Sequence, residues 1–130
     1  MRSIIIFFIV MTSGLVLHGQ VRTCKSLHIG TFKSSLKKDI GITVIKREGN
    51  LQIEENDYLG YKLAFNITWI DDCTYELTLK EVIKGDPAWM KDNKYKIKVR
   101  IKQIKKNSYS TEQSSDFSGK ISTNEYLIVQ

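Results

Sequence analysis

The feature that most constrains the fold is a strict alternation of apolar and polar residues over three long stretches. Between Tyr61 and Trp69 every second residue is apolar or aromatic, and the residues between them are mostly polar. The same pattern recurs over 73–79 and 95–102. A period of two aligns side chains on one face of a β-strand, whereas in an α-helix it scatters them around the axis. We therefore expect three long strands, each with one apolar face packed on the core and one polar face exposed to solvent.

Shorter apolar stretches with turn residues between them flank these three strands. We expect strands over 29–33, 42–48, 51–55, 109–113, 116–121 and 125–129. Turns are expected where Gly, Asn, Asp and Ser cluster, because these residues adopt tight backbone conformations, at 49–50, 71–72, 107 and 122–124. About eight short strands in succession predict an all-β fold, a small antiparallel up-and-down barrel. Closure of such a barrel leaves no unpaired sheet edge.

The first 19 residues have the pattern of a secretory signal peptide. Arg2 supplies a positive start, and a mostly apolar stretch from Ile4 to Leu17 follows it. This stretch of about 14 residues is shorter than the roughly 20 that cross a bilayer as a helix. We expect cleavage after Gly19, export to the periplasm or the extracellular space, and no transmembrane segment in the mature chain. An uncleaved membrane anchor and a lipoprotein modified at Cys24 are the alternatives.

The mature chain, 20–130, is expected to be one β-barrel domain. The sequence has 130 residues in all, and the part that remains after cleavage is long enough for one modest core. One short helical turn is expected near 87–91, since Asp86 suits the N-cap and Pro87 the first helical position. The net charge of +6 predicts a basic surface. We expect a monomer.

Two cysteines, Cys24 and Cys73, are present in the whole chain. In an oxidising compartment paired cysteines usually form a disulfide, and only one intramolecular pairing is possible here. Free thiols are the alternative. Two cysteines without a clustered histidine do not make a zinc site, so we expect no metal and no cofactor.

Several motifs resemble those of a known group of proteins. In chain order they are Gly30-Thr31-Phe32-Lys33, then Ile45-Lys46-Arg47 with Gln52-Ile53-Glu54, and then 69–77, in which Trp69, Cys73, Tyr75 and Leu77 are the most distinctive residues. The sequence resembles small secreted bacterial proteins with a lipocalin-like, calycin-type barrel, over roughly 24–102. The resemblance implies a fold and no activity. Some members carry an automatic DNA topoisomerase IV label, which the length, leader and motifs of this chain do not support.

The aromatic side chains of the expected inner face are candidate ligand contacts. Small barrels either fill their interior with such side chains or line a ligand cavity with them, and both alternatives stay open. The helical turn near 87–91 would then cap or plug one end. The candidate ligand-binding residues are Tyr61, Phe65, Trp69, Tyr75, Trp89 and Tyr95.

A row of basic residues follows the third long strand. At a period of two, five of them share one face over about 27 Å, at roughly 3.3 Å per residue. Such a row can meet a polyanion, such as nucleic acid or a sulfated glycan, or it can be an ordinary solvated face. Glu76 and Glu81 on neighbouring strands are expected to neutralise part of it. The candidate anion-binding residues are Lys94, Lys96, Lys98, Arg100 and Lys102.

Catalytic patterns are missing from the sequence. His28 is the one histidine after the leader, and neither a nucleophile elbow nor a phosphate-binding glycine loop is present. The carboxylates Asp71 and Asp72 are explained by a turn. We therefore expect no catalytic residues and a non-enzymatic exported protein that binds a small apolar ligand or a cell-envelope partner. A basic surface module that binds polyanions is the alternative.

Overall fold

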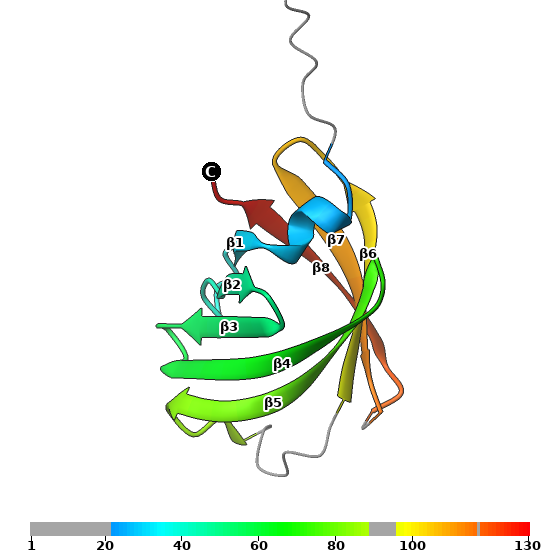
Figure 1. Cartoon of the computed structure of the whole chain (residues 1–130). Helices are drawn as coiled ribbons and strands as arrows, with labels where there is room; N and C mark the ends of the chain where they lie inside the picture. Colours follow the sequence, from blue (N-terminus) through cyan, green and yellow to red (C-terminus); the bar gives the residue numbers. More distant parts are fainter. Residues whose placement is uncertain (1–21, 89–95, 117) are drawn as a thin grey trace, which may run out of the picture.

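The computed structural model describes residues 22–88, 96–116 and 118–130, and it folds these residues into a closed barrel of eight antiparallel strands (Figure 1). Each strand pairs with the next along the chain, and the last pairs with the first, with Phe32 opposite Ile128. The up-and-down barrel predicted from the alternation is confirmed. A short 3-10 helix, η1 (Lys25–His28), precedes the strands. The strands are β1 (Gly30–Ser34), β2 (Val44–Glu48), β3 (Leu51–Asn56), β4 (Tyr61–Asp71), β5 (Thr74–Lys84), β6 (Lys96–Ile104), β7 (Ser108–Ser115) and β8 (Ile121–Ile128).

The alternating residues of β4, β5 and β6 form most of the core. Strand β4 buries Tyr61, Leu63, Phe65 and Ile67, as the pattern predicts. The other buried hydrophobic residues of these three strands are Ala64, Tyr75, Leu77, Val99 and Ile101. Ala64 is out of phase because the pairing between β4 and β5 shifts on both sides of it, and such bulges bend long strands around a barrel.

The turn between β4 and β5 forms where Asp71 and Asp72 predict it. The backbone N–H of Cys73 donates a hydrogen bond of 2.9 Å to Oδ1 of Asp71, so the short carboxylate side chain closes the turn. This hydrogen bond to the Cys73 backbone is also the main cause that lowers the pKa of the Asp71 carboxyl.

The prediction for the last two strands was wrong. Separate strands were expected over 116–121 and 125–129, with a turn at 122–124, but 122–124 lie inside β8. There they pair with β7, and Asn124 stands opposite Thr111. Gly119, with a φ of 61°, instead lies in the connection between β7 and β8, in the left-handed region that favours glycine. The polar residues of 122–124 fit a strand because pairing with β7 satisfies their backbone hydrogen-bonding groups. Most of their side chains lie on the outer surface.

Two smaller predictions need adjustment. Strand β2 begins at Val44 and not at residue 42, and η1 was not expected from the sequence. Residues 89–91 of the helical turn expected near 87–91 lie outside the described residues.

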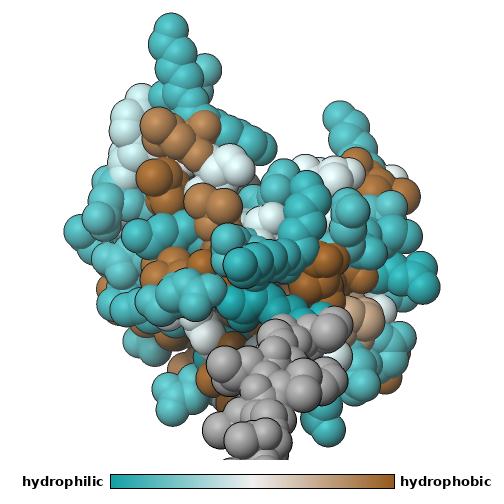
Figure 2. All heavy atoms as spheres, turned by 90° about the horizontal axis from the view of Figure 1, so that it is seen from above, coloured by the Kyte–Doolittle hydropathy of each residue, from teal (hydrophilic) through white to brown (hydrophobic). Residues whose placement is uncertain are grey.

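The outer surface is mixed in character. In Figure 2 hydrophobic side chains lie among hydrophilic ones on the face seen from above. Exposed apolar side chains are common on folded domains, so the interior is the more informative part of this molecule. Among the described residues, no helix is long and apolar enough to cross a bilayer.

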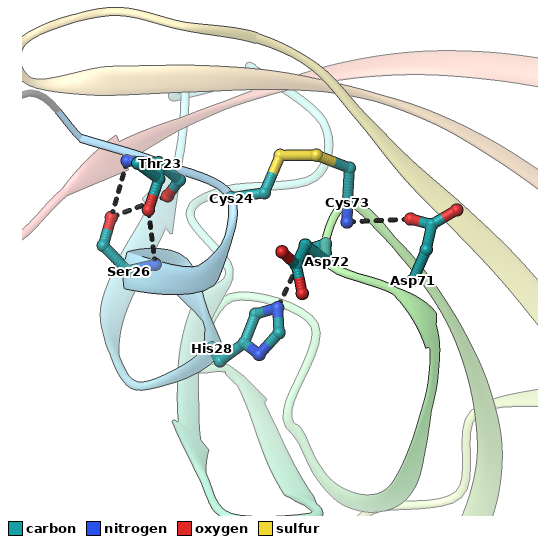
Figure 3. Close-up of a disulfide and its surroundings, with 7 residues drawn as sticks. All are labelled: Thr23, Cys24, Ser26, His28, Asp71, Asp72 and Cys73. Atoms are coloured by element: carbon teal, nitrogen blue, oxygen red, sulfur yellow. Dashed lines mark hydrogen bonds between the residues drawn. A yellow bond between two sulfur atoms is a disulfide. The ribbon is translucent and has the colours of Figure 1, made fainter.

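A disulfide joins Cys24 to Cys73, with 5.0 Å between their Cα atoms, and it ties η1 to the turn between β4 and β5 (Figure 3). The predicted pairing is confirmed. His28 strengthens the same connection, because its Nε2 lies 2.8 Å from the carbonyl oxygen of Asp72. Leu27, only 1% exposed, joins the core from η1. The helix thus covers this end of the barrel.

Removal of the disulfide is expected to cost substantial stability. The two cysteines are 49 residues apart, and for a loop of that length the chain-entropy model gives a loss of about 4 kcal/mol. The double substitution Cys24→Ser and Cys73→Ser should lower the free energy of unfolding by that amount in urea titrations. A loss below about 1 kcal/mol would contradict the expected contribution of the covalent link.

Candidate functional site

The centre of the barrel holds a buried arginine. Arg47 lies on β2, and only 2% of its surface is exposed. Its Nε donates to Oε1 of Gln52 at 2.8 Å, and its Nη1 donates to the carbonyl oxygen of Leu27 at 3.0 Å. Its Nη2 donates to the hydroxyls of Tyr75 at 2.8 Å and Tyr109 at 2.9 Å. These bonds use four of the five N–H groups of a guanidinium.

Aromatic rings surround the same guanidinium. Its carbon Cζ lies 4.7 Å from the ring centre of Phe32 and 5.0 Å from that of Tyr75, within cation–π range. Burial opposes the charge, but the tyrosines around Arg47 outweigh it and raise the pKa of the guanidinium. Arg47 therefore stays charged inside the barrel, and its neighbours replace the water it has lost.

A second polar link runs from Arg47 to a carboxyl group. Nε2 of Gln52 donates a hydrogen bond of 2.8 Å to Oε1 of Glu54, so the Gln52 amide stands between the two charged groups. Burial raises the pKa of the Glu54 carboxyl, although the bond from Gln52 and the charge of Arg47 act in the opposite direction. The carboxyl is thus poorly solvated in its ionised form.

Glu54 faces a cavity of about 180 Å³. The described residues that line it come from the connection between β1 and β2 and from six of the strands, namely β1, β2, β3, β4, β7 and β8. They are Ser34, Lys37, Ile40, Gly41, Thr43, Ile45, Glu54, Tyr61, Gln113, Asn124 and Tyr126. Most of these residues carry hydrogen-bonding side chains, and Ile40, Ile45 and the tyrosine rings add apolar surface, so the lining is of mixed polarity.

The cavity and η1 lie toward opposite ends of the barrel. Ser34, the last residue of β1, lines the cavity, whereas η1 precedes the first residue of the same strand. The chain Leu27–Arg47–Gln52–Glu54 therefore runs along the inside of the barrel, from the end that η1 covers to the cavity.

The connection between β1 and β2 is held in place by the interior. Asn56, which is fully buried, donates from Nδ2 to the carbonyl oxygen of Ile40 at 2.8 Å and to the hydroxyl of Thr43 at 3.1 Å. Gly41 has a φ of 75°, and a Cβ added there would lie 2.6 Å from Cβ of Tyr58. This wall of the cavity is therefore fixed by a polar anchor and by a close approach that only glycine permits.

The structure separates the candidate ligand-binding residues. Tyr61 lines the cavity, and its hydroxyl hydrogen-bonds to the side chain of Thr43. Phe65 and Tyr75 are buried core residues that the cavity does not include. Trp69 stacks on His28, with 3.4 Å between ring centres. Trp89 and Tyr95 lie outside the described residues.

The polar residues of the interior were missed by the sequence analysis, although a signal was present. Arg47 lies two residues after the buried Ile45, and Gln52, Glu54 and Asn56 follow each other at a period of two. Their alternation therefore places them on inward faces. Apolar residues alone are therefore an incomplete marker of the inward face in this barrel.

The basic row keeps the geometry that its alternation predicts. Lys96, Lys98, Arg100 and Lys102 are all exposed on β6, and Lys94 lies outside the described residues. Acidic residues stand beside the row. Glu76 on β5 is opposite Lys98, and Glu112 on β7 is opposite Arg100. Glu112 also forms an ion pair of 3.8 Å with Lys102.

The described part of the chain contains no group of three or more His, Cys, Asp and Glu side chains that could hold a metal ion.

No protein-family model matches this chain, and no curated protein and no solved structure is significantly similar to it. The arrangement inside the barrel is therefore the basis for a functional conclusion. Its polar side chains and the Glu54 carboxyl provide hydrogen-bonding groups and one acidic group at the cavity wall.

Arg47 is expected to be essential for stability. Arg47→Met leaves the buried Gln52 amide and the Tyr75 and Tyr109 hydroxyls without their donor, and each such loss is costly. We expect the free energy of unfolding to fall by at least about 3 kcal/mol. The control is Lys46→Met, on the neighbouring exposed position of β2, with a change within about 0.5 kcal/mol. Equal losses for both variants in urea titrations would contradict the central role of Arg47.

The buried tyrosines are expected to limit stability at high pH. Burial raises the pKa of Tyr75, Tyr109 and Tyr126 above its ordinary value of 10. The folded state then holds these protons more tightly than the unfolded state, so stability falls as the pH rises above 10. Phenolate absorbance from these residues should appear together with the loss of the circular dichroism signal. Complete ionisation of all tyrosines while the spectrum stays native would contradict this.

Proposed function

We propose that this chain is an exported, non-enzymatic, lipocalin-like barrel that binds a small molecule in the cavity beside Glu54. The observation that carries the proposal is the cavity itself, about 180 Å³ in volume and lined by side chains that can donate and accept hydrogen bonds. Binding sites for small molecules are typically concave, with a few convergent polar groups. The disulfide and the apolar leader support export, since structural disulfides persist in oxidising compartments.

The volume limits the ligand. A cavity of about 150 Å³ holds a molecule of the size of benzene, whereas drug-sized ligands occupy roughly 300–1,000 Å³. A fatty acid or a haem is therefore too large for the described cavity. Its walls contain Ser34, Thr43, Gln113 and Asn124. The ligand we propose is consequently smaller and more polar than the apolar ligand expected from the aromatic residues of the sequence.

The chemistry of the described interior favours binding over catalysis. Glu54 is the one carboxyl group that lines the cavity among the described residues. His28 lies on η1, toward the other end, where it contacts Asp72 and Trp69. The other titratable side chains of the described lining are Lys37, which is exposed, and Tyr61 and Tyr126, whose pKa burial raises further above neutrality. They do not supply the matched general acid or base that catalysis beside Glu54 would need.

The outer face of β6 supports a polyanion-binding function less well. Its basic side chains lie beside Glu76 and Glu112, and Lys102 is already paired with Glu112. The opposite charges reduce the local potential that would attract a polyanion. We therefore place the binding function inside the barrel.

A cavity-filling substitution provides the test. Asn124 lines the cavity, and its neighbour Thr123 is exposed on the outside of β8. Fragments of about the size of one substituted aromatic ring should raise the melting temperature of the wild-type protein. At ten times the dissociation constant the stabilisation is about 1.4 kcal/mol, which corresponds to several degrees.

Asn124→Tyr should abolish this stabilisation, because the larger side chain occupies the cavity, while Thr123→Tyr should keep it. Both variants are first checked for a native circular dichroism spectrum. The proposal is wrong if no polar fragment stabilises the wild-type protein, or if Asn124→Tyr binds fragments as well as the wild-type protein does.

A further inference from the structure

We propose that the cavity selects a small organic cation, a protonated amine, and that the Glu54 carboxylate is its counter-ion. This inference rests on the proposed function and adds the charge of the ligand to it.

Glu54 retains unused acceptor capacity at the cavity wall. The residue lies on β3 between Ile45 of β2 and Leu63 of β4, and its side chain lines the cavity. In the described part of the chain, its carboxyl accepts one hydrogen bond, from Nε2 of Gln52 to Oε1. An ionised carboxylate has about four acceptor positions on its two oxygens. The positions that remain can accept donors from a ligand.

Arg47 does not satisfy Glu54 directly. Its hydrogen bonds go to four neutral acceptors, and the Gln52 amide separates its Nε from the Glu54 carboxyl. Among the residues that the structure describes, the partly buried Glu54 carboxylate therefore has no contact ion pair. A cation in the cavity would supply this pair, and an opposite charge within about 4–6 Å favours the ionised form of a carboxyl group.

The other walls suit an ammonium group and a short apolar body. An ammonium has three donors and no acceptor. Asn124 offers its amide oxygen, and Gln113 offers the second acceptor position of an amide oxygen that already accepts from Nδ2 of Asn124 at 3.4 Å. Tyr126 offers a hydroxyl oxygen, and the rings of Tyr61 and Tyr126 offer aromatic faces that attract cations. Ile45 adds an apolar surface for the rest of the molecule.

The remaining charged and titratable groups near Glu54 are compatible with a cation. Lys37 is exposed at the rim of the cavity, where water screens its charge, whereas Glu54 lies at the wall. The groups that act electrostatically on Glu54 come from β2, β4, β5, β7 and β8, and they are Arg47, Tyr61, Tyr75, Tyr109 and Tyr126. The tyrosines are neutral at ordinary pH because burial raises their pKa, so Arg47 is the single fixed charge among these five.

Binding of a cation should be linked to a proton. Burial raises the pKa of Glu54 above its ordinary value of 4.5, so the free protein holds a proton there at a pH at which an exposed carboxyl has lost it. An ammonium stabilises the ionised form and therefore expels this proton. Affinity should rise with pH above 4.5 and level off once Glu54 is ionised in the free protein.

The experiment compares three molecules of nearly equal size, namely benzylamine, benzyl alcohol and benzoate, by isothermal titration calorimetry on the mature chain. We expect benzylamine to bind most tightly and benzoate most weakly. Glu54→Gln should weaken benzylamine binding by at least about tenfold, or roughly 1.4 kcal/mol, and leave benzyl alcohol binding unchanged.

Glu55→Gln is the matched control. Glu55 follows Glu54 on β3, and it pairs with Lys62 at 3.8 Å in a partly exposed ion pair. Its substitution should leave benzylamine binding unchanged. Titrations of the wild-type protein at a pH just above 4.5, in buffers of different ionisation enthalpy, should show proton release with benzylamine and none with the alcohol, and this readout does not depend on a variant folding.

The outcomes separate the inference from the proposed function. The inference is overturned if benzylamine binds no more tightly than the alcohol or benzoate, if Glu54→Gln keeps its affinity for benzylamine, or if no proton is released. In these cases the cavity can still bind neutral fragments. If no fragment of any charge binds the wild-type protein, the proposed function fails together with the inference.

Discussion

The Arg47 guanidinium cannot lose its hydration inside the barrel unless the protein returns hydrogen bonds to it. The elements around it meet this requirement together, because η1, β3, β5 and β7 each supply one acceptor. Gln52 is only 5 residues from Arg47, but Leu27, Tyr75 and Tyr109 are 20, 28 and 62 residues away, so all four acceptors surround Arg47 only after the barrel has closed. The buried charge thus disfavours partly closed or shifted arrangements of the strands, in which the same acceptors would be out of reach.

The same interaction divides the interior into two parts. Toward η1 the acceptors of Arg47, the disulfide and Leu27 fill the space, and this end is closed by both covalent and noncovalent contacts. Beyond Gln52 the polar chain continues to Glu54, and the barrel is not filled. The cavity therefore lies where the acceptors of Arg47 end, and its polarity follows from the residues that continue the inward alternation of β3.

Much of the barrel follows from local sequence patterns. The alternation over β4, β5 and β6 predicts their inward faces, and the cysteine count predicts the disulfide. The cavity could not be predicted, because its walls come from segments that only meet when β8 pairs with β1. Arg47 and Glu54 were overlooked for a different reason. Polar residues on a strand are usually exposed, and only their phase relative to Ile45 places them inside.

The size of the cavity determines where binding energy can come from. A molecule that fits about 180 Å³ has little apolar surface to bury, and at about 25 cal/mol per Å² this burial supplies a modest free energy. Specificity for such a ligand then depends on a few polar contacts, of which a desolvated carboxylate is the strongest available. The N–H groups of Arg47 already donate to other acceptors, so Arg47 does not compete for that carboxylate. The stability of the barrel and the availability of Glu54 thus have the same origin, namely the neutral acceptors that hold the guanidinium on the far side of Gln52.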